Sequence, residues 1–137
     1  MSQYVVNSEY SGEPWSIENK TDLYSFWGDE TKADGGQEKG PNPVQYLAGA
    51  VNDCITLSIV MIAAHRKMDV RNVKIKNTAH TRSLGHGKSD VDQMKIEISF
   101  ESKMTLEERQ KFIDHALQVS TVYQTVAKAV EMDIKLV

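Results

Sequence analysis

The sequence predicts one α+β domain over residues 1–137, with consecutive strands grouped around a long apolar helix. Three observations lead to this prediction. Apolar residues alternate with polar ones over residues 94–100, a continuous apolar run covers residues 55–64, and a helix-capping signal stands at residues 105–108. Strands that follow one another without an intervening helix favour an α+β fold over a doubly wound sheet.

The composition is that of a soluble globular domain, with 40% hydrophobic residues, 26% charged residues and a net charge of −3. A weakly acidic chain without a Lys/Arg cluster argues against nucleic-acid binding, which needs a concentrated basic surface. The longest apolar run has about ten residues, fewer than a membrane span requires, and no signal peptide is recognised. The single cysteine allows no internal disulfide, so a cytoplasmic location is expected.

The first third of the chain is expected to form three strands. Residues 4–10 and 14–20 are predicted to pair as a hairpin that turns at residues 11–13, and residues 23–27 add a third strand. Trp15 and Ile17 are expected on one strand face, and the aromatic side chains of this segment are expected in the core. Residues 28–41 carry four glycines and many charges without periodicity, which predicts a loop.

A long helix is predicted over residues 42–67. Asn42 can cap it, and Pro43 suits its first turn because proline fixes φ and needs no amide donor there. The run at residues 55–64 is apolar on nearly every side, so the helix is expected to be buried all round. Two arrangements achieve this: a sheet on one side with a second subunit on the other, or a monomer wrapped tightly around the helix.

An antiparallel strand pair is predicted after the helix. Residues 70–80 alternate as a half-buried strand with a basic outer face, residues 82–91 resemble a Gly-rich loop, and residues 94–100 form the clearest strand. Thr105 and Glu108 form a capping box for a helix that runs to about residue 117. Its inward side chains are expected to be Leu106, Phe112, Ile113 and Leu117.

The C-terminal segment is predicted to hold a second helix and an edge strand. Thr121 and Gln124 repeat the start signal, and the helix is expected to run to about residue 131. Its inward residues are expected to be Val122, Val126 and Val130. Residues 134–137 complete the chain as a strand.

These features together suggest a family. The pairs Asp29-Glu30 and Gly35-Gly36 are followed by the segment GPNP at residues 40–43, and Cys54 stands eleven residues after Pro43. This combination resembles the OsmC/Ohr family of osmotically inducible and organic hydroperoxide resistance proteins, over essentially the whole chain. The resemblance implies antiparallel sheets wrapped around a long central helix in an intertwined homodimer. It also implies reduction of organic hydroperoxides, in which a thiolate becomes a sulfenic acid that a second cysteine resolves.

The family's catalytic residues match this chain only in part. The resemblance places the peroxidatic cysteine at Cys54. Val44 occupies the position of the family's glutamate, Ser120 occupies that of the resolving cysteine, and no arginine precedes Arg66 to replace the N-terminal arginine. The resemblance therefore implies a thiol protein of the oxidative-stress, hydroperoxide type that lacks the full two-cysteine cycle.

Two hypotheses about Cys54 remain open at this point. In one, the protein is a one-cysteine hydroperoxide reductase that uses an external thiol as reductant. In the other, Cys54 is a small buried hydrophobe, and the dimer binds a small apolar ligand or a partner at its interface pocket. A mid-helix position beside Asp53 favours the protonated thiol, whereas a cation from the second subunit would favour the thiolate. The candidates for that cation are Arg66, Arg82 and Lys88.

No cofactor and no metal are expected. The four histidines lack the short ligand spacings of zinc sites, and no GxSxG elbow supports nucleophilic hydrolysis. One alternative stays open, in which the loop folds back so that His80 and His86 converge with Asp90 or Asp92.

Overall fold

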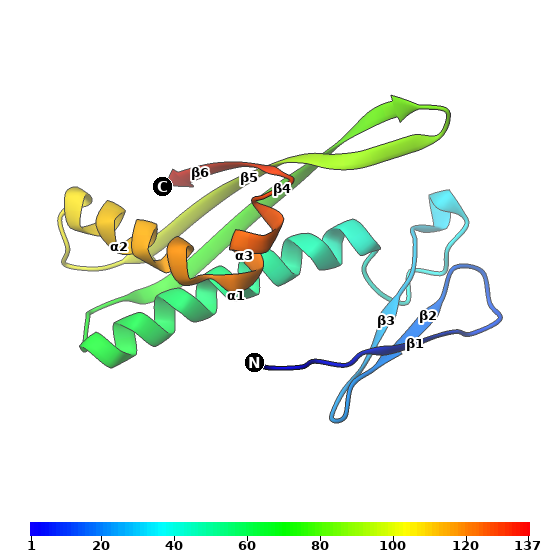
Figure 1. Cartoon of the computed structure of the whole chain (residues 1–137), viewed down its shortest axis with the longest axis horizontal. Coiled ribbons are helices and arrows are strands. Elements are labelled where there is room, and N and C mark those ends of the chain that lie inside the picture. The colour runs from blue at the N-terminus through cyan, green and yellow to red at the C-terminus, as the bar shows by residue number, and fades with distance from the viewer. The chain divides into compact units, whose positions relative to one another are not determined.

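The structure is a computed structural model that describes all of residues 1–137 (Figure 1). The chain forms two compact units, Met1–Tyr46 and Leu47–Val137, which are described separately. The single domain expected over residues 1–137 stays a prediction.

The N-terminal unit is built on a three-stranded antiparallel sheet in the order β1-β2-β3. Its strands are β1 (Asn7–Tyr10), β2 (Ile17–Lys20) and β3 (Ser25–Gly28), followed by the short 3₁₀ helix η1 (Lys32–Asp34). The three predicted strands and their hairpin pairing are therefore confirmed, although each strand is shorter than expected. The paired register covers four residues of each strand, and the residues beyond it close the two turns, with Ser11 N–H donating to the Ser16 carbonyl and Thr21 N–H to the Tyr24 carbonyl.

The predicted position of Trp15 is wrong. Trp15 precedes β2, its backbone is left-handed at φ 64°, and its side chain is 54% exposed. Tyr4, Tyr10 and Tyr24 are also exposed, so the aromatic side chains of this unit do not form the core that the sequence suggested. A three-stranded sheet this small has too little area to bury them.

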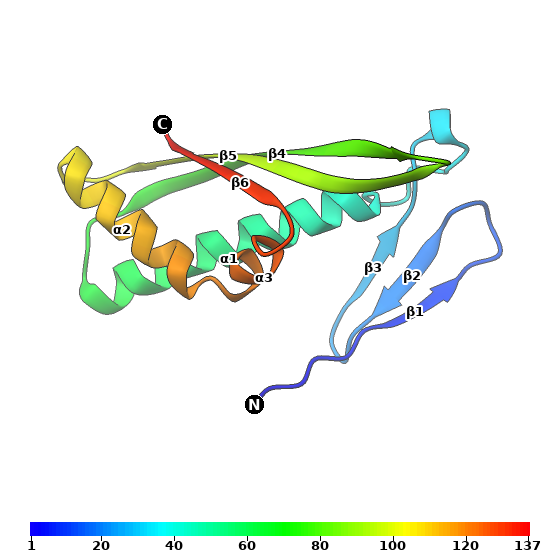
Figure 2. The same ribbon diagram turned by 45° about the horizontal axis from the view of Figure 1, so that its top comes forward.

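The second unit contains all the longer elements (Figures 1 and 2). Helix α1 (Pro43–Arg66) begins in the last residues of the first unit and continues into the second. It is followed by β4 (Arg71–Gly85), β5 (Lys88–Glu101), α2 (Leu106–Val119), α3 (Thr121–Val126) and β6 (Glu131–Leu136). The sheet order is β4-β5-β6, with β5 antiparallel to β4 and parallel to β6. A parallel neighbour needs a long crossover, which α2 and α3 supply.

Helices α1, α2 and α3 lie on the same face of this sheet (Figure 2). The core between them is apolar because each element turns one apolar face inward. Helix α1 contributes Val51, Ile55, Ile59 and Ala63; β5 contributes Met94, Ile96, Ile98 and Phe100; and α2 contributes Phe112, Ile113, Ala116 and Leu117. The alternation predicted for residues 94–100 is therefore confirmed as a strand with one buried face.

The limits predicted for α1 are nearly those observed. Asn42 Oδ1 accepts from the backbone N–H of Gln45 at 2.9 Å, and the Gln45 side chain accepts from the N–H of Asn42 at 2.9 Å. This reciprocal pair satisfies two amide donors that helical bonding leaves free. An 18-residue window of α1 has a mean hydropathy of 1.8, so by length and composition it qualifies as a membrane span, as core helices of soluble proteins also do.

The expectation that α1 is buried all round is wrong for the chain by itself. Only the stripe that faces the core is buried, whereas Leu57, Val60 and Met61 are 57%, 40% and 66% exposed. Within the second unit, the sheet and helices α2 and α3 cover one side of α1 and leave the other side uncovered. The apolar outer stripe is therefore the feature that a second subunit would have to cover.

Two further expectations differ from the structure. Residues 82–91 are not a loop, because β4 and β5 remain paired up to Gly85 and Lys88. Only His86 and Gly87 turn the chain, at φ 53° and 74°, the positive angles of a type I′ hairpin turn. Leu106 is 74% exposed rather than inward, because it stands in the first turn of α2, beyond the edge of the core.

The last predicted helix is much shorter than expected. Helix α3 ends at Val126, and β6 begins at Glu131, where the predicted helix was still running. The capping signal at Thr121 is not used: Ser120 is the N-cap residue without a capping side-chain bond, and Gln124 donates to the carbonyl of Leu117 at 2.9 Å. By contrast, the capping box of Thr105 and Glu108 on α2 is formed as predicted.

Candidate functional site

Cys54 lies in the middle of α1, on the flank between its buried stripe and its exposed face. It is the only cysteine, and it is half-buried and free. Its Sγ accepts a hydrogen bond from the backbone N–H of Val122 at 3.4 Å. The thiol is therefore held against the start of α3, an element 68 residues further along the chain.

A small hydroxyl cluster joins α1 to the α2–α3 junction beside Cys54. Ser120 is fully buried, and its Oγ lies 2.7 Å from the carbonyl of Ala116 and 2.8 Å from Ser58 Oγ. Ser58 in turn donates to the carbonyl of Cys54 at 2.9 Å, and Ser120 Oγ lies 3.4 Å from that carbonyl. Since each hydroxyl carries one proton, the two serines form a relay that ends on the backbone of Cys54.

Cys54 and Ser120, two of the positions that the sequence singled out, are thus neighbours. The serine hydroxyl cannot form a disulfide, so a sulfenic acid at Cys54 has no second sulfur within this chain to attack it. Sequence reasoning missed Ser58 and the N–H of Val122. Ser58 was detectable, because a residue four positions after Cys54 lies on the same helix face. The contact with Val122 depends on tertiary packing and has no local signal.

The other predicted site positions lie elsewhere. Val44 stands in the first turn of α1, within the N-terminal unit, and is partly buried. Arg82 pairs with both carboxylate oxygens of Asp90, at 2.8 and 3.0 Å, which raises the pKa of its guanidinium. Lys88 follows the hairpin turn, and Arg66 Nη2 donates to His115 Nε2 at 3.3 Å. Within the second unit, no cation of this chain bonds the sulfur.

The alternative metal site on the hairpin is contradicted by the structure. The residues from His80 to His86 run along extended strand into the turn, which separates the two imidazoles by roughly 20 Å at about 3.3 Å per residue. Asp90 is engaged by Arg82. No group of three or more His, Cys, Asp or Glu side chains is placed to hold a metal ion.

The Asp29-Glu30 and Gly35-Gly36 pairs of the N-terminal unit have a structural explanation centred on Asp29. The Asp29 carboxylate is 3% exposed and accepts from the Ser16 hydroxyl at 2.7 Å and from the backbone N–H groups of Glu30, Gln37 and Lys39 at 2.8 to 3.2 Å. Burial alone would raise the pKa of this carboxyl, but the four hydrogen bonds lower it to about 2. The carboxylate therefore stays ionised and fixes the loop that leads into α1.

The glycines of this loop are required by close backbone approaches. A Cβ at Gly36 would collide with the carbonyl of Glu30, and one at Gly40 would collide with the carbonyl of Trp27. Gly35 has a left-handed backbone at φ 91° and packs against the Trp15 indole. The Gly-Gly pair and the glycine before Pro41 thus fold the loop over Asp29, rather than binding a ligand by themselves.

The chain matches the family model described as OsmC-like protein over residues 36–135. Among solved structures, an OsmC-like protein from Mycoplasma pneumoniae is similar, with a TM-score of 0.86, 15% identity, and coverage of 99% of this chain and 96% of that one. An organic hydroperoxide resistance protein OsmC from Legionella pneumophila has a TM-score of 0.78 at 13% identity, with 99% and 97% coverage.

A third similar structure is an organic hydroperoxide resistance protein from Elizabethkingia anophelis, with a TM-score of 0.79, 15% identity, and coverage of 99% and 96%. No curated protein matches the chain. At these sequence identities, the similar structures support only the assignment of the fold. Membership of the family is supported by the match to the family model. The resemblance noted in the sequence is confirmed, and the chain belongs to the OsmC-like protein family.

Proposed function

We propose that this protein is a thiol protein of the hydroperoxide type in which Cys54 acts as a single reactive cysteine. The proposal depends mainly on the position of the Cys54 thiol. Cys54 is half-buried, and its Sγ accepts a hydrogen bond from the backbone N–H of Val122. Two solved structures of this fold are named as organic hydroperoxide resistance proteins, which supports the same class of substrate.

The proposed reaction begins with attack of the Cys54 thiolate on the outer oxygen of an organic hydroperoxide ROOH. The S–O bond forms as the O–O bond breaks, and the departing alkoxide takes a proton to leave as the alcohol ROH. Cys54 becomes a sulfenic acid. An external thiol then displaces water to give a mixed disulfide, and a second external thiol releases the Cys54 thiolate and a small disulfide.

Ser120 explains why the reductant has to come from outside. It lies beside Cys54 but carries oxygen in the place where a resolving sulfur would stand. The second step therefore depends on a small thiol that can reach a half-buried sulfur. We expect the helices around Cys54 to block a protein-sized reductant sterically. We place the protein in the cytoplasm, where such thiols are plentiful.

A homodimer is part of this proposal. The exposed stripe of Leu57, Val60 and Met61 runs along the face of α1 next to Cys54, and it is the kind of apolar surface that a second copy of the helix would cover. Family membership supports the same arrangement. In the dimer, the thiol would be further shielded, and cations of the second subunit are the candidates to polarise the peroxide.

The test is the turnover of cumene hydroperoxide with dithiothreitol as reductant, measured as the decrease in peroxide concentration. Wild type is expected to consume peroxide, and Cys54→Ser is expected to be inactive. The matched variant is Ser120→Cys, which restores a second sulfur beside Cys54. After one equivalent of peroxide it should form an internal disulfide, visible as a mass loss of two hydrogens. Equal consumption by wild type and Cys54→Ser would refute the proposal.

A second candidate function is binding without catalysis. It is favoured by a hollow of about 210 Å³ in the N-terminal unit, lined by Trp15, Ile17, Pro43 and the segment 28–30. The left-handed backbone of Trp15 is uncommon for a bulky residue and holds the indole at the rim of this hollow. In this reading the dimer binds a small apolar ligand. Ligand-dependent quenching of tryptophan fluorescence in Cys54→Ser, together with absent peroxide turnover in wild type, would favour it.

A further inference from the structure

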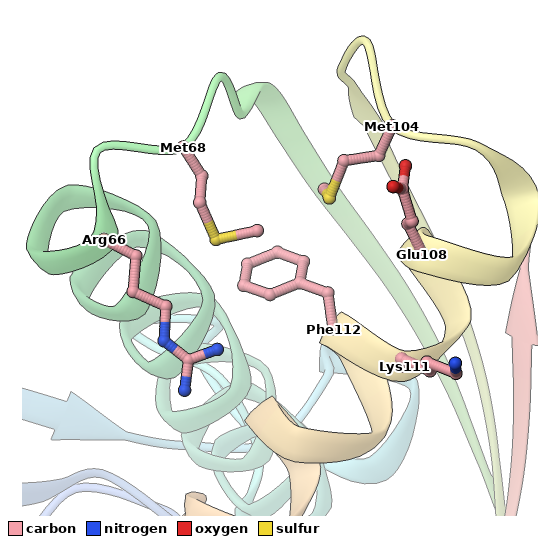
Figure 3. Close-up of a pocket in the computed structure, with 6 residues that line it drawn as sticks. All are labelled: Arg66, Met68, Met104, Glu108, Lys111 and Phe112. Atoms are coloured by element: carbon pink, nitrogen blue, oxygen red, sulfur yellow. The ribbon is translucent and has the colours of Figure 1, made fainter.

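A pocket of about 370 Å³ opens at the far end of the second unit from the hairpin turn, where the C-terminal end of α1 meets α2 (Figure 3). It is lined by Arg66, Met68, Met104, Glu108, Lys111 and Phe112. Arg66 is twelve residues beyond Cys54, which corresponds to about 18 Å along the helix at 1.5 Å per residue. The pocket is therefore separate from the thiol and independent of the function proposed for it.

The interior of this pocket is apolar and has one rigid wall. Phe112 is only 5% exposed and packs edge-on against Phe100, with ring centroids 5.9 Å apart. Met68 and Met104 approach the Phe112 ring from two sides (Figure 3). Both methionines are partly exposed, and their unbranched thioether chains can adapt to a guest. A rigid aromatic wall with two flexible thioethers fits an alkyl chain.

The charge available at the mouth of the pocket is positive. Arg66 forms no ion pair with a carboxylate of this chain; its side-chain partner is His115 Nε2 at 3.3 Å. Glu108 lies on the opposite rim, and its carboxylate already accepts the N–H of Thr105 at 2.8 Å (Figure 3). Lys111 pairs with Glu107 at 3.2 Å, and its side chain points away from Phe112 (Figure 3). The unpaired guanidinium is thus a site for a carboxylate.

The volume limits the length of the guest. Ligand pockets span roughly 300 to 1,000 Å³, and this one lies near the lower end of that range. Such a volume suits a chain of about eight to twelve carbons at the density of a protein interior. Guanidinium groups bind carboxylates through two parallel N–H donors, which fixes the head group while the chain adapts.

We propose that this pocket binds a medium-chain alkyl carboxylate, with the chain against Phe112, Met68 and Met104 and the carboxylate on the Arg66 guanidinium. A free alkyl carboxylate and an anionic membrane lipid both combine an alkyl chain with a negative charge. The experiment therefore includes both as ligands and distinguishes between them.

The test is isothermal titration calorimetry of the full chain with sodium decanoate below its micelle concentration. Wild type is expected to bind one decanoate per protomer. Arg66→Gln is expected to weaken binding at least tenfold, because the charged hydrogen bonds are lost. Decanol is expected to bind at least tenfold more weakly than decanoate for the same reason. Met104→Gln, which puts an amide into the apolar interior, should weaken decanoate and decanol alike.

The control variant is Arg82→Gln, which removes another exposed arginine that is already paired with Asp90. It is expected to bind decanoate as wild type does, and so is Cys54→Ser. Circular dichroism would establish that Arg66→Gln is folded. Unchanged affinity in folded Arg66→Gln, weaker binding in Cys54→Ser, or binding only to phosphatidylglycerol vesicles and not to decanoate would each overturn the proposal.

Discussion

Two substitutions only two residues apart on α1, on opposite faces of the helix, separate the core of the chain from its proposed dimer interface. Ile59 is fully buried between α1, β5 and α2, whereas Met61 is 66% exposed on the other side of the helix. Ile59→Ala removes buried carbons and leaves a cavity, which costs about 3 kcal/mol. At a urea dependence of roughly 2 kcal/mol per molar, the unfolding midpoint should fall by about 1.5 M.

Met61→Asp should act differently because its side chain contacts little within the chain. An exposed substitution changes the stability of one protomer by about 0.5 kcal/mol at most. In a two-fold symmetric dimer, however, the charge enters the interface twice, at a cost of several kcal/mol. A total of about 4 kcal/mol would weaken dimerisation roughly a thousandfold. We therefore expect a folded monomer at micromolar concentration.

The assays are urea unfolding followed by circular dichroism and sedimentation velocity at matched protomer concentrations. Met61→Gln serves as the control, because it changes the side chain without adding charge and should weaken the dimer far less. A Met61→Asp protein that stays dimeric at micromolar concentration would refute the proposed interface. An Ile59→Ala midpoint within about 0.3 M of wild type would refute the assignment of the core.

Three further predictions concern local features. The pKa of Asp29 is lowered from 3.8 to about 2, so the ionised carboxylate stabilises the folded N-terminal unit above pH 3.8, and this stabilisation is lost as the pH falls through about 2. The fluorescence of the two tryptophans, both in the N-terminal unit, should report this loss. The Asp29→Asn variant should lack this pH dependence. Asn77→Val should raise the free energy of unfolding by about 1 kcal/mol in urea titrations, because the buried Asn77 Oδ1 has no donor and valine suits a strand. Thr105→Ala should lower it by about 1 kcal/mol, since it removes the hydroxyl that accepts the N–H of Glu108, whereas Thr105→Ser should nearly restore it.

The elements with strong periodicity or a complete capping signal were predictable from the sequence. Residues 94–100 of strand β5 alternate without interruption, α1 starts where Asn42 and Pro43 indicate, and the capping box of Thr105 and Glu108 forms. Other signals were ambiguous in physical terms. Glycines near residues 85–87 are typical of an open loop and also of a tight type I′ turn, and only the pairing of β4 with β5 decides between them.

The candidate site was predictable in its parts but not in its arrangement. Cys54 stands out as the only cysteine, and the family resemblance placed Ser120 opposite it. The hydrogen bond from Val122 and the relay through Ser58 depend on how α3 packs against α1, and α3 itself was predicted too long. The same packing diverts Gln124 from the expected cap to the carbonyl of Leu117. Local sequence cannot encode contacts between segments this far apart.

The most direct measurement of the central claim is single-turnover oxidation of Cys54 without any reductant. Wild-type protein is mixed with one equivalent of cumene hydroperoxide per protomer and then with dimedone, and the products are analysed by mass spectrometry. We expect one equivalent of cumyl alcohol and a dimedone adduct on the peptide that contains Cys54. An unmodified Cys54 thiol with the hydroperoxide intact would contradict it.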